Sequence, residues 1–210
     1  GGVLAIANLR GGGEYGKAWH DAGRLDKKQN VFDDFIGAGE YLIAEGIAGK
    51  GQVAIEGGSN GGLLVGAVTN QRPDLFAAVI SSVGALDMVR AEDSPNGVPN
   101  IPEFGSKRTE PGFRALLAMS TYHQIRDGTP YPAVMLTHGV NDPRVEVWHS
   151  TKTAARLMAA SASARPVLLR LDFDAGHGIG STKQQDEQER ADMIVFLLWQ
   201  MGEPGYAPAP

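Results

Sequence analysis

The fold of this chain is decided by the stretch Val53-Ala54-Ile55-Glu56-Gly57-Gly58-Ser59-Asn60-Gly61-Gly62-Leu63-Leu64-Val65. A short apolar run leads into a turn of the form Gly-x-Ser-x-Gly, and small apolar residues follow it. Between a strand and a helix, such a turn holds the serine in a strained conformation that small neighbours permit, and it exposes the serine Oγ above the sheet. The stretch predicts a nucleophile elbow with Ser59 as the candidate nucleophile. The alternative is an ordinary glycine-rich turn with a solvated serine.

Two later loops offer the partners that a serine nucleophile needs, a histidine base and a carboxylate that orients it. Residues 134–137 read as a buried strand, and Asp142 lies just past its end. Residues 167–171 read as the next strand, and His177 lies in the glycine-flanked loop that follows. Ligands of parallel α/β sheets bind at the carboxyl ends of the strands, and serine, acid, histidine is the hydrolase order. We therefore expect a catalytic triad of Ser59, Asp142 and His177.

Each partner also has another interpretation. Asp142 could form a turn before Pro143, and His177 could belong to a metal cluster with Asp172 and Asp174. No paired histidine motif and no cysteine ligand supports such a cluster, so we predict no metal and no other cofactor. A non-catalytic binding module on a hydrolase fold is a further alternative, which a complete Ser/Asp/His set disfavours.

Composition limits the classes of function. The chain has 210 residues, 42% of them hydrophobic and 20% charged, with a formal net charge of −5 and no cysteine. These values are ordinary for one soluble globular domain, and they give no basic footprint for nucleic acid. No apolar run is long enough to span a bilayer and no basic-then-apolar leader opens the chain. We expect a soluble protein, cytoplasmic or periplasmic, with no nucleic-acid or membrane partner.

Strand-like and helix-like runs alternate along the chain, which predicts an α/β fold with a mostly parallel sheet flanked by helices. Only about five strands are visible, so we expect the first strands of an α/β-hydrolase sheet to lie outside this chain. A proline- and glycine-rich segment, 93–111, is too long for a simple connector and predicts a pocket-shaping insertion. The expected elements are strands at 3–9, 53–55, 77–83, 134–137 and 167–171, helices at 30–45, 62–70, 151–160 and 187–201, a catalytic domain over 1–203 and a flexible tail over 204–210.

Seven blocks of the chain, in order, resemble signatures of the prolyl oligopeptidase family of serine peptidases, and the resemblance covers nearly the whole chain. The blocks are Asn8-Leu9-Arg10-Gly11-Gly12-Gly13-Glu14-Tyr15-Gly16, Lys28-Gln29-Asn30, Phe32-Asp33-Asp34-Phe35, Gly57-Gly58-Ser59-Asn60-Gly61-Gly62-Leu63-Leu64, Asn70-Gln71-Arg72-Pro73-Asp74-Leu75-Phe76, Asp142-Pro143-Arg144-Val145 and Ala175-Gly176-His177-Gly178.

The resemblance implies the same triad, with the backbone N–H of Asn60 donating to the oxyanion and with Arg144 and Val145 binding substrate. It also implies short peptides as substrates. In relatives, an upstream tyrosine supplies a second oxyanion donor and an N-terminal propeller domain gates access by peptide size. Neither is present in these 210 residues, so we expect both to belong to a longer parent protein.

Specificity departs from the family pattern. Proline-selective members resemble one another in stacking the substrate proline on a tryptophan of the insertion, and this insertion has none; Asn100 falls near that position. Phe104 offers an aromatic wall, whereas Glu103 resembles the acidic residues with which the oligopeptidase B branch recognises basic side chains. Asn60, where that branch more often has alanine, favours cleavage after proline. Basic-selective cleavage, an esterase and a dipeptidyl or acylaminoacyl peptidase remain alternatives.

A hypothesis from another class rests on Gly11–Lys17, which has the spacing of a phosphate-binding loop. Ala18 stands where a Ser or Thr hydroxyl would ligate Mg²⁺, and residues 19–23 are a poor start for the helix that must follow. Nucleotide binding is therefore the remote alternative.

Overall fold

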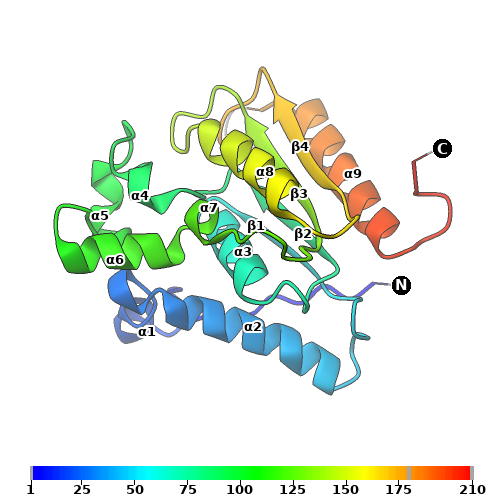
Figure 1. Ribbon diagram of the computed structural model, residues 1–210, viewed down its shortest axis with the longest axis horizontal. Helices are drawn as coiled ribbons and strands as arrows, with labels where there is room; N and C mark the ends of the chain where they lie inside the picture. The colour runs from blue at the N-terminus through cyan, green and yellow to red at the C-terminus, as the bar shows by residue number, and fades with distance from the viewer. Residues whose placement is uncertain (1, 179–180, 209–210) are drawn as a thin grey trace.

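The computed structural model describes residues 2–178 and 181–208, and within them four parallel strands form one sheet (Figure 1). Each strand pairs with the next one along the chain, so the order is β1-β2-β3-β4. Because all four strands run the same way, the loops that carry Ser59, Asp142 and His177 emerge at one edge of the sheet. The strands are β1 (Ala54–Gly58), β2 (Ala78–Ser82), β3 (Ala133–Gly139) and β4 (Val167–Asp172).

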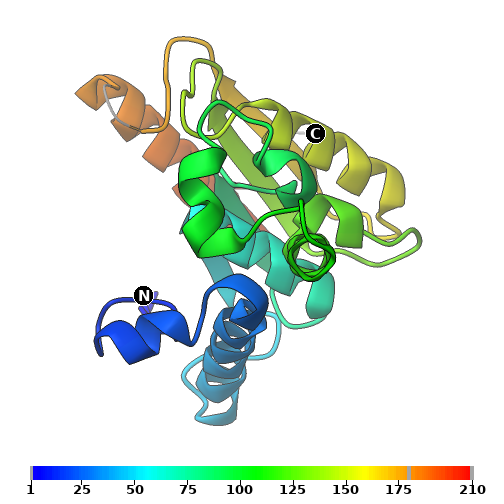
Figure 2. The ribbon, with the colours of Figure 1, turned by 90° about the vertical axis from the view of Figure 1, so that its left-hand side faces the viewer.

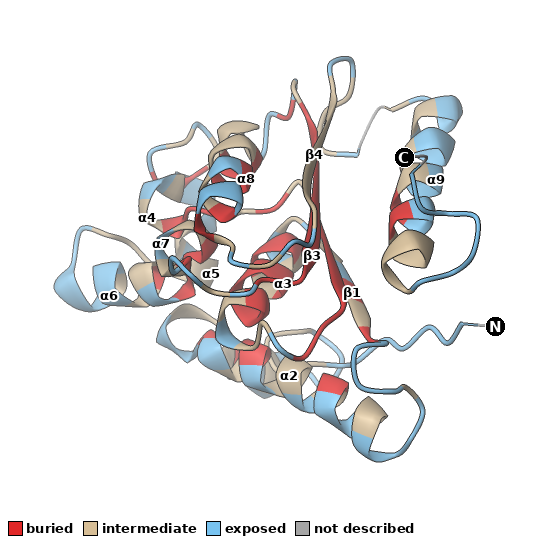
Figure 3. Cartoon of the chain, turned by 45° about the vertical axis from the view of Figure 1, so that its right-hand side comes forward, coloured by how far each residue is buried: buried red, intermediate tan, exposed pale blue. Residues whose placement is uncertain are grey.

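Helices cover both faces of the sheet. They are α3 (Asn60–Gln71) and α8 (Trp148–Ala160) on one face and α9 (Lys183–Gln200) on the other (Figure 3). Strand side chains alternate between two cores: Val79 and Leu136 pack on the α3 and α8 side, whereas Ile80 and Met135 pack with Phe196 of α9. Apolar residues on both faces of every strand are what a doubly covered parallel sheet requires, so the predicted architecture is confirmed.

The predicted helices form with small shifts at their ends. The helix expected at 187–201 begins earlier, because Thr182 caps it: the hydroxyl of Thr182 accepts the N–H of Gln185, whose side chain bonds back to the N–H of Thr182. The remaining helical segments are α1 (Lys17–Asp21), the 3₁₀ turn η1 (Leu25–Lys27), α2 (Gln29–Ala44), α4 (Met88–Ala91), the 3₁₀ turn η2 (Val98–Asn100), α5 (Ile101–Phe104), α6 (Glu110–Met119) and α7 (Thr121–Gln124).

One local prediction is wrong. Residues 3–9 form no strand, and Val3, Leu4 and Ile6 are 76–85% exposed. A strand needs a hydrogen-bonded neighbour, and no other described segment pairs with this one. Residues 19–23, expected to be a poor helix start, begin no helix: α1 is only five residues long and ends at Asp21.

The insertion is folded rather than extended. It contains η2 and α5 and leads into α6, and with α4 it stands at the end of the molecule that faces the viewer in Figure 2. In the tail, residues 204–208 have no helix or strand and are exposed, whereas 209–210 lie outside the described residues. Among the helices of the described ranges, none is long and apolar enough to cross a bilayer.

Candidate active site

Ser59 occupies the strained position that the elbow motif predicts. Its φ of 58° and ψ of −116° lie where L-residues are rarely found, and its N–H is bonded to the Ser82 carbonyl at 2.8 Å. The glycines around it are required by close approach. A Cβ at Gly57 would lie 2.3 Å from the Gly61 carbonyl oxygen, and one at Gly62 would lie 2.5 Å from the Cα of Gly84.

The structure brings together the three residues of the predicted triad. His177 Nε2 lies 3.0 Å from Ser59 Oγ, and His177 Nδ1 lies 2.6 Å from Asp142 Oδ2. A carboxylate only accepts, so Nδ1 carries the proton, and Nε2 is left free to accept the Ser59 hydroxyl. This is the tautomer that a general base needs before it takes a proton from serine.

The Asp142 carboxylate is fully occupied by donors. Its Oδ1 accepts the backbone N–H groups of Arg144 at 2.8 Å and Val145 at 2.9 Å, while its Oδ2 faces His177 and, at 3.3 Å, the Nε2 of His138. Burial acts to raise the pKa of Asp142, but these hydrogen bonds outweigh it and lower the pKa to about 2. The carboxylate therefore stays ionised at any pH at which the imidazole is active.

Asn60 is the first residue of α3, so its backbone N–H has no acceptor within the helix and stands at the positive end of the helix dipole. This is the geometry of an oxyanion donor next to the nucleophile. The side chain of Asn60 points elsewhere, and its Nδ2 donates to Glu103 Oε1 at 3.3 Å.

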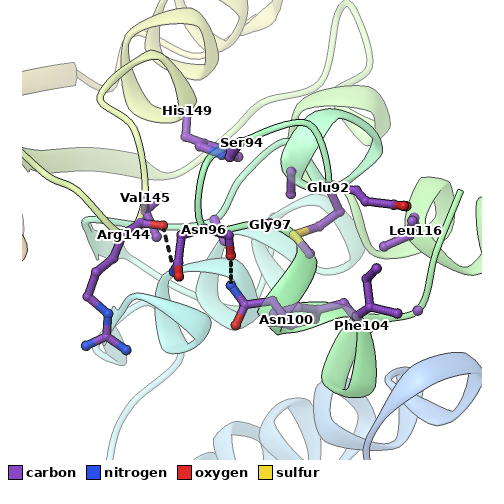
Figure 4. Close-up of a pocket in the computed structure, with 15 residues that line it drawn as sticks. Glu92, Ser94, Asn96, Gly97, Asn100, Phe104, Leu116, Arg144, Val145 and His149 are labelled. Carbon is purple, nitrogen blue, oxygen red and sulfur yellow. Dashed lines mark hydrogen bonds between the residues drawn. The ribbon is translucent and has the colours of Figure 1, made fainter.

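A cavity at the loop that follows Asp142 is lined by four of the residues expected to bind substrate: Asn100, Phe104, Arg144 and Val145 (Figure 4). The insertion shapes this cavity, because Asn100 Nδ2 bonds the Asn96 carbonyl at 2.8 Å, and Asn96 Nδ2 reaches the Arg144 carbonyl at 3.3 Å. The other lining side chains are mostly apolar and include Ala85, Met88, Ala91, Ile101 and Leu116.

Glu103 does not line that cavity. Its carboxylate forms an ion pair of 2.9 Å with Lys28, whose side chain is only 5% exposed, and it lies 3.8 Å from His20 Nε2. Glu92 does line the cavity, yet its carboxylate is taken up by Ser106 Oγ, the Lys107 N–H at 2.8 Å and Arg108 Nε at 3.0 Å. Glu92 and Glu103 thus already have donors.

Three functional neighbours were missed from the sequence: Lys28, Glu92 and His138. Lys28 stood in a family block, but nothing in that block shows that its ammonium is buried against Glu103. His138 directly follows the strand predicted at 134–137 and lies within β3, a pattern that indicates burial without indicating a partner. Glu92 precedes the insertion, and no local spacing indicates the donors that reach it.

The geometry gives little support to the two alternative sites, the metal cluster around His177 and the phosphate-binding loop at Gly11–Lys17. Asp172, one member of the possible metal cluster, accepts the backbone N–H groups of Asp174 and Ala175 at 2.9 and 3.0 Å, and within residues 2–178 and 181–208 no group of three or more His, Cys, Asp or Glu is placed to hold a metal. Lys17 of the phosphate-loop alternative forms an ion pair with Asp21 of its own helix.

Comparisons with known proteins find prolyl endopeptidases and related peptidases among the most similar sequences and structures. The chain is 44% identical to a prolyl endopeptidase of Elizabethkingia miricola over 203 residues, which is 96% of this chain and 29% of the relative. A solved structure from a study of two prolyl endopeptidases matches with a TM-score of 0.87 and 48% identity, over 97% of this chain and 28% of the other. Oligopeptidase B from Trypanosoma brucei with covalently bound antipain matches with a TM-score of 0.90 and 34% identity, over 94% and 28%.

The fold is that of an α/β-hydrolase catalytic domain of the kind found in serine peptidases. The family model for the Prolyl oligopeptidase family matches residues 1–204. The chain belongs to the prolyl oligopeptidase family, which confirms the resemblance seen in the sequence, and it spans 29% of the length of the Elizabethkingia relative.

Proposed function

We propose that the protein is a serine oligopeptidase that cleaves short peptides on the C-terminal side of proline. The observation that carries the proposal is the continuous hydrogen-bonded line from Ser59 Oγ through His177 to Asp142, at 3.0 and 2.6 Å, at the carboxyl edge of the sheet. The prolyl endopeptidase relatives support the same activity.

In this mechanism, Ser59 Oγ attacks the peptide carbonyl carbon while His177 Nε2 takes the hydroxyl proton. His177 gives that proton to the leaving amine as the C–N bond breaks, which leaves an acyl-enzyme. Water then attacks the acyl carbon and loses a proton to His177, and the proton returns to Ser59 as the ester bond breaks. Asp142 stays ionised throughout, and the Asn60 N–H stabilises the oxyanion.

The preference for proline rests on the cavity wall. Met88, Ile101, Phe104 and Val145 offer apolar surface for a pyrrolidine ring, and Glu103 and Glu92 are each paired with a cation of the protein itself. A basic side chain that bound to Glu92 or Glu103 would have to displace the cation already paired with it. The alternative of a basic-selective peptidase keeps its support from the fold of oligopeptidase B.

We also propose that the full-length gene product carries a propeller domain that gates access to this site. The chain spans only 26–29% of the length of its prolyl endopeptidase relatives, which leaves room for a further domain. Short peptides would then be cleaved and folded proteins would not.

The test is cleavage of matched fluorogenic peptides with proline, arginine or alanine before the reporter, by the full-length gene product and its Ser59→Ala variant. We expect Ser59-dependent turnover of the proline peptide. Preference for arginine would reassign the protein to basic-selective cleavage, and activity retained in Ser59→Ala would refute the triad.

A further inference from the structure

His138 is a buried histidine that the proposed reaction does not use. It lies on β3, its side chain has no exposed surface, and neither does that of Asp142 beside it. His138 Nδ1 is 2.7 Å from Ser150 Oγ, and His138 Nε2 is 2.8 Å from the Val145 carbonyl oxygen and 3.3 Å from Asp142 Oδ2. Buried polar groups need hydrogen-bond partners, and here the partners include the candidate catalytic acid.

The partners determine the tautomer of this imidazole. The Val145 carbonyl and the Asp142 carboxylate only accept, so the proton is on Nε2, which it shares between them. In the neutral ring, Nδ1 must then accept, and the Ser150 hydroxyl donates to it. Ser150 is fully buried on α8, so a helix on one face of the sheet supplies the partner of the second ring nitrogen.

We propose that His138 is a positioning residue for the catalytic acid. Its Nε2–H holds the Asp142 carboxylate and the Val145 carbonyl in one arrangement, so the loop after β3 keeps the acid aimed at His177 and keeps Val145 in the wall of the cavity. The inference rests on the proposed function, and it extends the triad by one residue that contacts no substrate.

Among the groups around Asp142, His138 is the side chain that can position the carboxylate without taking part in the reaction. His177 approaches from the loop after β4 and donates to the same oxygen, while Arg144 and Val145 supply only backbone N–H groups. His149 of α8 is the next titratable neighbour. Burial lowers the pKa of His149 to about 4, and its Nδ1 accepts the Asp87 N–H at 3.0 Å, so it stays neutral and does not compete.

Two variants of similar polarity separate positioning from packing. In His138→Asn the amide reaches the place of Nδ1, so it keeps Ser150 but loses Asp142 and Val145; in His138→Gln the amide nitrogen reaches the place of Nε2. Losing a hydrogen bond to a charged group costs enough free energy to lower a rate by about 10-fold or more when that bond positions the catalytic acid. We expect His138→Asn to lower kcat by about 10-fold and His138→Gln to stay within about 3-fold of the native value.

The pH profile supplies the readout that a structural role would not move. The acid limb of kcat/KM should fall with a slope of one in the native protein, because only the general base takes up a proton. In His138→Asn, Asp142 loses one of the hydrogen bonds that lower its pKa to about 2, so the slope should steepen toward two as the pH falls below about 4. His138→Gln should restore a slope of one.

The experiment uses the full-length gene product, with melting temperatures measured to confirm that each variant is folded. A folded His138→Asn variant with native kcat and native slope would overturn the inference. If that variant does not fold, the native profile decides, because a slope of two above about pH 4 would show that Asp142 is not held ionised. Absence of Ser59-dependent cleavage in the native protein would instead overturn the proposed function, and this inference with it.

Discussion

The buried ion pair between Lys28 and Glu103 joins three distant parts of the chain, and its loss should be measurable. Lys28 stands between η1 and α2, Glu103 lies on α5 of the insertion, and Glu103 also accepts from Asn60 beside the nucleophile. Lys28 Nζ lies 5.1 Å from the centre of the Phe104 ring, a cation–π contact. Replacing either charged partner leaves the other without its counter-charge.

The structure allows the size of the loss to be estimated for each partner. Removing one member of a fully buried pair costs about 3–5 kcal/mol because an uncompensated charge stays buried. In Glu103→Gln the stranded group is Lys28, whose side chain is 5% exposed, so we expect about 3 kcal/mol. In Lys28→Met the stranded group is Glu103, which is 24% exposed and can be hydrated, so we expect about 1–2 kcal/mol.

The double variant Lys28→Met with Glu103→Gln is the matched control, because it strands no charge. At about 2–4 °C per kcal/mol for a domain of this size, the melting temperature should fall by about 6–12 °C in Glu103→Gln, less in Lys28→Met, and least in the double variant. Differential scanning fluorimetry of the full-length gene product measures this order. Strictly additive losses of stability, or a Glu103→Gln variant as stable as the native protein, would refute the reasoning. We expect no variant to gain cleavage after arginine, because Glu103 does not line the cavity.

Three further outcomes are expected. Asp142→Asn should lower kcat by about 10⁴-fold, because His177 then loses the partner that fixes its tautomer, and steady-state kinetics on the proline peptide would show it. The pKa of Asp142 is lowered by its hydrogen bonds from 3.8 to about 2, so the carboxylate contributes roughly 2 kcal/mol of stability above about pH 4 and loses it as the pH falls to 2. Chemical unfolding at several pH values should show this loss in the native protein and not in Asp142→Asn. Gly62→Ala should destabilise the fold by about 2 kcal/mol, since its Cβ would lie 2.5 Å from backbone of Gly84, whereas Gly61→Ala, with open space at its Cβ, should cost less in the same melt.

The parts of the fold that were predictable are those with strong local patterns. The elbow at Gly57–Gly61 combines a strand, a turn and a helix within a dozen residues, and the strands before Asp142 and His177 are continuous apolar runs. The triad followed from these three positions because parallel strands place their carboxyl ends together. The apolar run at 3–9 has the composition of a strand, which is why a strand is predicted there. A strand also needs a hydrogen-bonded neighbour, and local composition does not show whether one is present.

Pairings between distant residues could not be predicted from local patterns. Lys28 and Glu103 are 75 positions apart, so the sequence alone presents Glu103 as an acid available to a substrate and does not show its ion pair with Lys28. His138 is separated from Ser150 by 12 positions and a loop, so the hydrogen bond that satisfies its Nδ1 depends on how α8 packs against β3. The triad positions follow from topology alone, whereas the groups that hold the triad and shape the cavity follow from tertiary packing.

The contrast between topology and tertiary packing also separates the candidate triad from the cavity wall in this chain. The reacting groups stand on loops that the sheet fixes, and the cavity is closed by the insertion, whose contact with the site runs through Asn96 to the Arg144 carbonyl and through Glu103 to Asn60. Both contacts are hydrogen bonds of 3.3 Å and neither involves a residue of the candidate triad, so changes within the insertion can reshape the cavity while the hydrogen bonds of 3.0 and 2.6 Å in the triad stay intact. Under the proposed function, a substitution at Asn100 should therefore change which residue is accepted before the cleaved bond and leave the reaction of Ser59, His177 and Asp142 intact.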